Sequence, residues 1–237
     1  MTAKYLVTGA TGQFGQAVLR HLVETYEVAP ADIIAASRKP DALADWAAKG
    51  VNVRAVNFDD AASMETAFAG VERVLIISTD SLDRPGHRLT QHRAAIKAAE
   101  QAGVRHVLYT SMPEPENSPL LFAPDHEGTE AALKASGLPA WTVLRNNWYF
   151  ENLFMSAGSV LSSGHWYSAA GQGRIAHIAR DDLARAAAAA LLAGCADNPA
   201  RPTTPAYSGA QRPDPTRPPR PRPRPARRRV RSSPRRS

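Results

Sequence analysis

The sequence is poor in cysteine and has no long apolar run. Its 237 residues contain one cysteine, Cys195, which excludes a disulfide within the chain. No apolar stretch approaches the roughly 18 residues that a membrane-spanning helix needs, so no membrane span is expected. The start of the chain, MTAKYLVTGA, lacks the charged segment and the apolar run of a secretory signal peptide. Together these absences predict a cytoplasmic location.

Two common kinds of catalytic site are also missing from the sequence. Histidine, cysteine and acidic residues do not cluster at the spacings of metal ligands, so no metal site is predicted. The G-x-S-x-G motif of serine hydrolases is absent as well. Metal-assisted hydrolysis and serine-based acyl transfer are therefore not expected of this chain.

Basic residues are concentrated at the C-terminal end. The formal net charge is +7, but residues 199–237 hold twelve arginines and one aspartate, so the remaining 198 residues are mildly acidic. After Tyr207 the only branched apolar residue is Val230. Such a segment cannot bury enough apolar surface to offset the entropy of ordering it. We therefore predict a disordered Arg/Pro-rich tail at 208–237, with polyproline II character in RPRPRP.

Two origins of this tail are open. Its restricted alphabet of Arg, Pro, Ala, Ser and Thr is typical of GC-rich codons read in a shifted frame, which favours a frameshift near Ser208–Arg212. The alternative is a basic arm that binds nucleic acid through phosphate contacts. The tail has no aromatic residue for base stacking and no recognition module, so no specific nucleic-acid partner is expected.

Upstream of the tail, short apolar runs alternate with helical patterns. Runs such as VLII are apolar at every position, which is typical of parallel strands covered by helices on both faces. This alternation predicts an α/β fold, a Rossmann-type doubly wound parallel sheet with a small C-terminal substrate lobe. We assign 1–145 to the Rossmann core and 146–207 to a partial substrate-binding lobe. Strands are expected at 4–8, 33–37, 51–56, 73–78, 106–111 and 141–145, and helices at 13–25, 41–49, 60–69, 88–102, 125–136 and 181–193.

A glycine-rich turn follows the first strand. In VTGATGQFG, Gly9 permits a tight turn, Gly12 lets the backbone approach a pyrophosphate, and Gly15 lets the helix pack close to the sheet. The free N–H groups at the helix start then bind the anion. A plain turn without a ligand is the alternative. The residues predicted to contact the cofactor here are Gly9, Ala10, Thr11, Gly12, Gln13 and Phe14.

The end of the second strand indicates which dinucleotide binds. An NAD site uses an acidic residue there, but this strand ends in AASRKP. The planar fork of Arg38 suits a 2′-phosphate, which favours NADPH; a solvated charge pair is the alternative. Phe58, followed by Asp59, is expected beside the adenine. Ser78 and Thr79 are expected near the nicotinamide ribose, unless they only cap their strand.

These motifs resemble those of the NmrA-like atypical short-chain dehydrogenase/reductases, and within them the NAD(P)H:quinone oxidoreductase type 2 enzymes. The similarity rests on TGATGQFG, ASRKP, YTS and LRNNWYFENL, and it covers roughly residues 4–195. Residues 117–153 are its most specific part. The resemblance implies an NADPH-binding Rossmann core, a quinone substrate and two-electron reduction. It also implies a longer C-terminal lobe than this chain carries.

The resemblance and the sheet pattern suggest a set of site residues. His126 is a candidate proton donor, or else a histidine packed against Glu130. Tyr149 is a second catalytic candidate, and with Trp148 it offers flat faces for a ring; anchoring of the second lobe is the alternative. Arg180 is expected at the cofactor phosphates, unless it pairs with an acid. The predicted substrate pocket comprises Tyr109, Asn147, Trp148 and Tyr149, and Asn146 is assigned to the cofactor.

Three functions are compatible with these features. The first is an NADPH-dependent quinone oxidoreductase, possible as a homodimer. None of the six tyrosines has lysine four residues later, so the Tyr-x-x-x-Lys acid of many short-chain dehydrogenases is absent. The second is a non-catalytic NmrA-like redox sensor that binds the dinucleotide. The third is a nucleic-acid-binding protein that uses its tail.

Overall fold

The computed structural model describes residues 4–167 and 173–193. Its centre is a parallel sheet of six strands in the order β3-β2-β1-β4-β5-β6. This order reverses direction after β1, as in the Rossmann fold, and it confirms the predicted fold class. The strands are β1 (Tyr5–Val7), β2 (Ile33–Ser37), β3 (Asn52–Ala55), β4 (Arg73–Ile76), β5 (His106–Ser111) and β6 (Trp141–Arg145).

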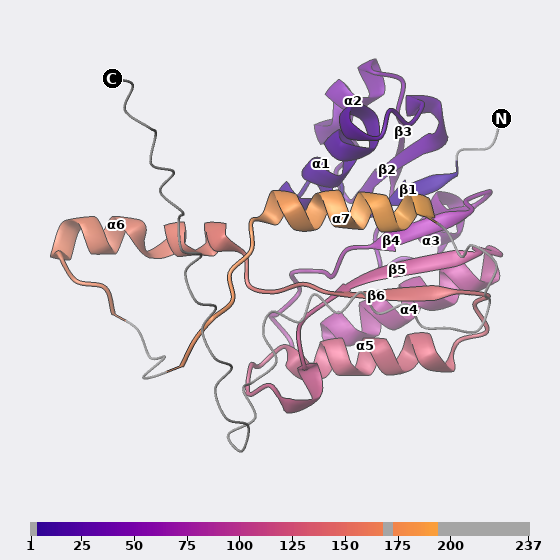
Figure 1. The fold of residues 1–237 in the computed structure, drawn as a ribbon. Coiled ribbons are helices and arrows are strands. Elements are labelled where there is room, and N and C mark those ends of the chain that lie inside the picture. The colour runs from indigo at the N-terminus through magenta and orange to yellow at the C-terminus, as the bar shows by residue number, and fades with distance from the viewer. Residues whose placement is uncertain (1–3, 168–172, 194–237) are drawn as a thin grey trace, which may run out of the picture.

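Helices cover both faces of this sheet (Figure 1). Apolar residues of α1, α2 and α7 form one core cluster with one face of the strands, and α3, α4 and α5 form the other. Consecutive strand residues therefore point to opposite clusters, as Leu6 and Val7 do. The helices are α1 (Gln13–Arg20), α2 (Ala44–Ala48), α3 (Ala61–Phe68), α4 (His87–Gln101), α5 (Ala123–Ala135), α6 (Phe154–Ser163) and α7 (Arg180–Ala193).

Two expected helices differ in detail from the structure. The segment 13–25 is regular only to Arg20 and continues as a π-helical turn, His21–Thr25. The segment 41–49 begins as a 3-10 turn at Pro40, and its α-helical part is Ala44–Ala48. Proline fixes the backbone at the first turn and donates no hydrogen bond, which suits such a start.

The chain after β6 divides into two parts. α7 packs along α1, and its residues Leu183 and Leu191 belong to the α1 cluster. α6 extends away from the sheet layers (Figure 1) and buries none of its residues. The division of the chain at residue 145 stays a prediction. The Arg/Pro-rich tail, its frameshift hypothesis and Cys195 lie outside the described residues. Within the described ranges, no helix has the length and hydropathy to cross a membrane.

Candidate functional site

A cleft of about 270 Å³ lies at the carboxyl ends of the central strands. Its walls come from the loops after β1, β2, β3 and β4 and from one residue of α4. This is the edge at which open α/β sheets bind their ligands, beside the point where the strand order reverses. The lining residues are Gly9, Thr11, Gly12, Ser37, Arg38, Val56, Asn57, Phe58, Ile77, Ser78, Thr79, Asp80, Ser81 and Gln91.

The glycine turn forms the floor of this cleft. Gly9 has a φ of 58°, which favours glycine, and its carbonyl oxygen accepts a hydrogen bond of 3.0 Å from the Gly12 N–H. A Cβ on Gly15 would lie 2.9 Å from the Ala10 Cα and would collide with the Gly9 carbonyl. Gly12 precedes α1 and caps it with no side chain, so the first N–H groups of the helix are available to an anion.

Arg38 stands at the mouth of the cleft. Its side chain is 65% exposed, and its guanidinium lies 3.4 Å from the Asp80 carboxylate, which follows β4. Below it, the hydroxyls of Ser37 and Thr11 are 2.9 Å apart and join the end of β2 to the glycine turn. An exposed guanidinium over this turn can bind a phosphate group with its planar fork. The alternative reading of Arg38 as half of a charge pair also holds, with Asp80 as its partner.

The end of β4 is held from behind by buried side chains. The backbone N–H of Ser78 donates to the Thr110 hydroxyl at 2.8 Å, and that of Thr79 donates to His92 Nε2 at 3.0 Å. His92 is fully buried, and burial followed by the nearby Arg88 charge lowers its pKa well below the usual value. Its Nε2 is therefore a neutral acceptor that fixes the Thr79 backbone at the cleft wall.

These features fit a dinucleotide. The helix start could hold a pyrophosphate and Arg38 a phosphate on the ribose, and the small Gly12 leaves room for close backbone approach. Seven of the predicted cofactor residues line this one cleft, although they come from four separate loops: Gly9, Thr11, Gly12, Arg38, Phe58, Ser78 and Thr79.

The other predicted cofactor residues lie elsewhere. Ala10 is fully buried, and its N–H donates to the Ala36 carbonyl. Gln13 and Arg180 line a second hollow, between the start of α1 and α2, that also contains Arg20 and Lys49. Asn146 directly follows β6 and is half-buried. Its backbone N–H donates to the Ser111 and Leu144 carbonyls, and its side-chain Nδ2 atom is buried.

The predicted proton donor His126 lies inside the protein, between α4, α5 and β5. Its side chain is 4% exposed, and neither hollow includes it. Arg88 Nη2 lies 3.1 Å from His126 Nε2, and because a guanidinium has no acceptor, Nε2 accepts and Nδ1 carries the proton. Nδ1 then donates to the Tyr109 hydroxyl at 2.8 Å. Burial and then Arg88 lower the pKa of His126 to about 3, so its ring is neutral.

Tyr109, predicted in the substrate pocket, is also fully buried. Burial raises the pKa of its hydroxyl. The alternative suggested for His126 is packing against Glu130; the carboxylate of Glu130 accepts hydrogen bonds from Arg145 at 2.7 Å and from the Ser111 hydroxyl at 2.7 Å. The catalytic role of His126 remains a prediction, and in this structure the histidine is part of the support behind the cleft.

Tyr149 lies on the glycine-turn side of the sheet. Its ring stacks parallel to that of Phe14, with centroids 6.0 Å apart, and the Arg180 guanidinium lies 5.1 Å from its ring centre. The backbone on either side of Tyr149 forms two hydrogen bonds with Ile178. The Phe150 N–H donates to the Ile178 carbonyl, and the Ile178 N–H donates to the Trp148 carbonyl. Tyr149 therefore anchors the segment after β6 to α1, as the alternative interpretation expected. Beside it, Trp148 is 42% exposed and Asn147 is half-buried.

Sequence reasoning missed three residues of α4: Arg88, Gln91 and His92. Gln91 and His92 lie three and four residues after Arg88, on the helical stripe that continues through Ala95 and Ala99, which are fully buried. Polar side chains on an otherwise apolar inner stripe are a detectable signal, because burying them requires specific partners. Here those partners belong to the cofactor cleft and its support.

Comparison with known proteins gives the same assignment. Residues 9–193 match the family described as NAD(P)H-binding. The chain is 42% identical over 182 residues to quinone oxidoreductase 2 of Escherichia coli, a match covering 77% of this chain and 62% of that protein. It is 30% identical over 207 residues to an NmrA-like family domain-containing oxidoreductase of Aspergillus flavus, covering 82% of this chain and 64% of that protein.

Solved structures agree with these sequence matches. The NADPH complex of the Escherichia coli NADPH-dependent quinone oxidoreductase has a TM-score of 0.74 at 41% identity, covering 79% of this chain and 64% of that one. Triphenylmethane reductase of Citrobacter sp., complexed with NADP(H), has a TM-score of 0.72 at 35% identity, covering 78% and 64%. The chain thus spans less than two thirds of the length of these relatives.

Proposed function

Because the chain belongs to the NmrA-like NAD(P)H-binding family, we propose that it is an NADPH-dependent oxidoreductase that reduces quinones by two electrons. The observation that carries this proposal is the cleft, where the glycine turn, Arg38 and the anchored end of β4 meet. The relative with 42% identity bears the name of a quinone oxidoreductase, which supports the choice of substrate.

Quinone reduction requires little of the protein beyond orienting the cofactor and the quinone. When bound, NADPH would supply a hydride to the quinone. The product would be a hydroquinone anion, whose charge is delocalised over the ring and which can take its proton from solvent. No Tyr-x-x-x-Lys acid is required, in agreement with its absence. Orientation by fixed groups is a sufficient source of rate enhancement for such a step.

Residues of the cleft wall and of the segment after β6 are assigned to this orientation. Ser78 and Thr79 form the wall next to the glycine turn, and the bond from Thr79 N–H to His92 holds that wall in place. We assign Trp148 to the quinone side, where its exposed indole offers a flat apolar face, and we assign to Tyr149 the role of holding the segment that carries it. A homodimer and a cytoplasmic location remain predictions.

The choice of NADPH over NADH rests on Arg38. Residues 38–40, directly after β2, include no acidic residue to bond a ribose 2′-hydroxyl, whereas the exposed guanidinium at this point suits a 2′-phosphate. Loss of this guanidinium removes a charge-assisted hydrogen bond, so Arg38→Ala is expected to weaken NADPH roughly tenfold to a hundredfold and to leave NADH unchanged.

The test is the oxidation of NADPH and NADH by a simple p-quinone with the wild type, Arg38→Ala and Arg105→Ala. Arg105 precedes β5 at the opposite edge of the sheet and is 76% exposed, so its variant is a matched control. Turnover with NADPH that falls selectively in Arg38→Ala supports the proposal. Tight NADPH binding without any turnover supports the non-catalytic sensor and contradicts the enzyme.

A further inference from the structure

Gln91 is the one residue of α4 that lines the cofactor cleft. Its side chain is buried, with 4% of the residue exposed. The amide nitrogen Nε2 donates to the Asp59 carboxylate at 2.8 Å. The carbonyl oxygen Oε1 is buried and has no hydrogen-bond donor among the described residues. A buried acceptor left without a donor is rare in native proteins and calls for an explanation.

The orientation of this carboxamide is determined by its neighbour. Hydrogen bonds from His87 and Gln91 lower the pKa of Asp59, so its carboxylate is ionised and only accepts. His87 Nε2 lies 2.8 Å from the second oxygen of the same carboxylate. The Gln91 amide must therefore turn its N–H₂ to Asp59 and its carbonyl away from it. Asp59 thus leaves the Gln91 carbonyl oxygen Oε1 as an acceptor available to a ligand.

The position of Gln91 identifies the part of the cofactor that it faces. Gly12 and the start of α1 mark the pyrophosphate end, and Arg38 marks the ribose that carries the 2′-phosphate. The base attached to this ribose has to lie farther toward β3, because β3 is the strand beyond β2. There the cleft wall is formed by Val56, Asn57 and Phe58 of the β3 loop, together with Gln91.

The edge of the base discriminates between nucleotides. Adenine carries an exocyclic amine, which is a donor, whereas guanine and hypoxanthine carry a keto oxygen, which is an acceptor. We propose that Gln91 Oε1 accepts a hydrogen bond from the adenine amine and that Asp59 is the positioning residue that fixes this orientation. The inference rests only on the cofactor part of the proposed function and does not depend on the quinone.

The experiment compares two dinucleotides by equilibrium binding, without a quinone. One is NADPH, and the other is its analogue with hypoxanthine in place of adenine. The wild type is expected to prefer NADPH by roughly tenfold or more, since the keto oxygen would face the Gln91 carbonyl. In Gln91→Met, which keeps the side-chain length, the ratio of the two dissociation constants is expected to fall toward one. Gln101→Met, at the exposed end of α4, is the control and should keep the wild-type ratio.

A second variant tests the role of Asp59 and remains informative if Gln91→Met does not fold. Asp59→Asn has both a donor and an acceptor, so the Gln91 carboxamide is free to turn over. We expect the hypoxanthine analogue to bind this variant more tightly than it binds the wild type. A Gln91→Met ratio equal to that of the wild type would overturn the proposal, as would an Asp59→Asn variant that binds the analogue no better.

The same measurements separate this proposal from the quinone reductase. Failure of the wild type to bind NADPH would overturn the cofactor assignment and the Gln91 proposal together. Binding with the expected discrimination supports Gln91 whether or not any quinone is reduced. None of these binding measurements depends on the reduction of a quinone.

Discussion

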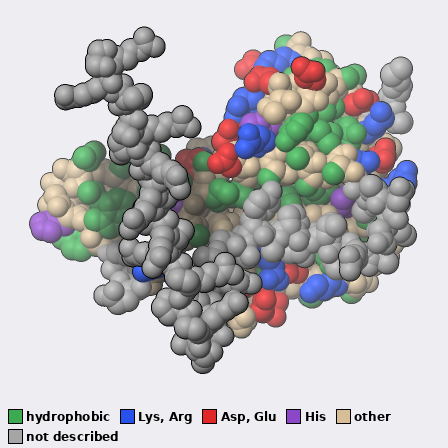
Figure 2. Space-filling view, in the orientation of Figure 1, with side chains coloured by type: hydrophobic (Ala, Val, Ile, Leu, Met, Phe, Trp, Pro, Cys, Tyr) green, Lys and Arg blue, Asp and Glu red, His purple; other side chains and the backbone are tan. Residues whose placement is uncertain are grey.

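α6 and α7 both follow the last strand, yet they differ completely in packing. α7 buries Leu183, Leu191 and three alanines against α1 and the sheet. α6 has no buried residue, and Phe154 and Leu161 on it are 67% and 86% exposed. Figure 2 shows apolar side chains gathered on the surface of α6, which projects from the rest of the molecule. α7, although it lies in the segment assigned to the second lobe, thus belongs to the core that carries the cleft, whereas α6 buries none of its residues.

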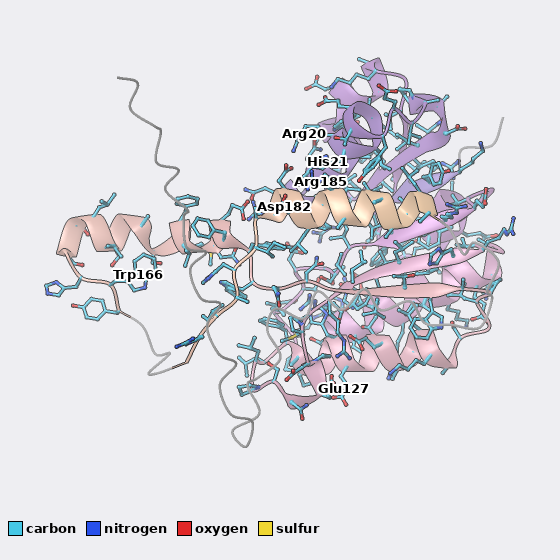
Figure 3. All side chains as sticks on the ribbon, viewed as in Figure 1. Arg20, His21, Glu127, Trp166, Asp182 and Arg185 are labelled. Carbon is cyan, nitrogen blue, oxygen red and sulfur yellow. The ribbon has the colours of Figure 1, made fainter. Side chains whose placement is uncertain are left out.

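Specific contacts explain why α7 belongs to the core. Its small alanines permit close packing on α1, and the Arg73 guanidinium donates to the carbonyls of Leu191 and Leu192 at its end. At its start, Asp181 binds Arg20 and lies 3.0 Å from His21 Nε2. Figure 3 shows Arg20 and His21 beside this start of α7, whereas Trp166, which follows α6, lies far from the sheet. Apolar composition alone does not distinguish the two helices; the difference lies in their partners.

A matched pair of leucine variants is expected to show the largest difference. Leu183→Ala removes a side chain that is 2% exposed and leaves a cavity between α7 and the sheet. It should lower the free energy of unfolding by about 2–5 kcal/mol. Leu161→Ala in α6 should change it by less than about 0.5 kcal/mol, because its side chain is in solvent. Urea unfolding measures both values, and equal losses would contradict the proposed division between the helices.

Gly15→Ala tests the packing of α1 on the glycine turn. The added Cβ would meet backbone atoms of Gly9 and Ala10, which cannot rotate away as a flexible side chain could. Overpacking of this kind costs about 1–3 kcal/mol. Because the backbone that must move belongs to the proposed pyrophosphate-binding turn, we expect NADPH binding to weaken as well. Calorimetry with NADPH measures the affinity, and a variant with wild-type affinity and melting temperature would show that the turn tolerates the methyl group.

Stability below neutral pH should depend on three buried histidines of the core. Burial lowers the pKa of His126 to about 3 and that of His106 to about 4, with Arg88 and Arg73 as further causes, and it holds the pKa of His92 well below its usual value. All three lie below the roughly 6.5 expected in the unfolded chain. The unfolded state therefore binds more protons as the pH falls below 6.5, and the folded state loses about 1.4 kcal/mol per pH unit for each histidine.

Unfolding curves at several pH values between 7 and 5 measure this slope. In His106→Gln one of the three titrating groups is absent, so the slope should be about two thirds that of the wild type. The amide can still bond the Thr142 hydroxyl, which His106 Nε2 contacts at 2.8 Å. A slope that is the same in variant and wild type would show that His106 is protonated in the folded state.

Much of the fold and of the cofactor site was predictable, because local rules determine both. Apolar runs marked all six strands, and Gly9, Gly12 and Arg38 follow strands whose ends meet at one edge of the sheet. For parallel strands, the position of a residue after its strand is enough to place it at the cleft. This is why seven residues from four loops came together as expected.

Side-chain direction was not predictable in the same way. His126 in α5 and Tyr109 in β5 were both expected to face the ligand. In the structure both side chains point inward, and they form a hydrogen bond with each other. Gln91 and His92 were missed because their roles depend on Asp59 and Thr79, which lie far away in the sequence. The exposure of α6 could not be predicted either. An apolar helix pattern indicates that one face is to be buried, but it does not show what covers that face.

The smallest expected effect tests whether α6 is coupled to the core at all. Gly158 lies in the middle of α6, and a Cβ added there meets nothing within 4 Å. Gly158→Ala should therefore favour the helical state of α6 by about 0.5–1 kcal/mol, since glycine is a poor helix former. Because α6 buries none of its residues, this gain should raise the helical circular dichroism signal while leaving the melting temperature of the core unchanged. A rise of several degrees would instead mean that α6 and the sheet unfold together, and that the apolar face of α6 is covered in solution.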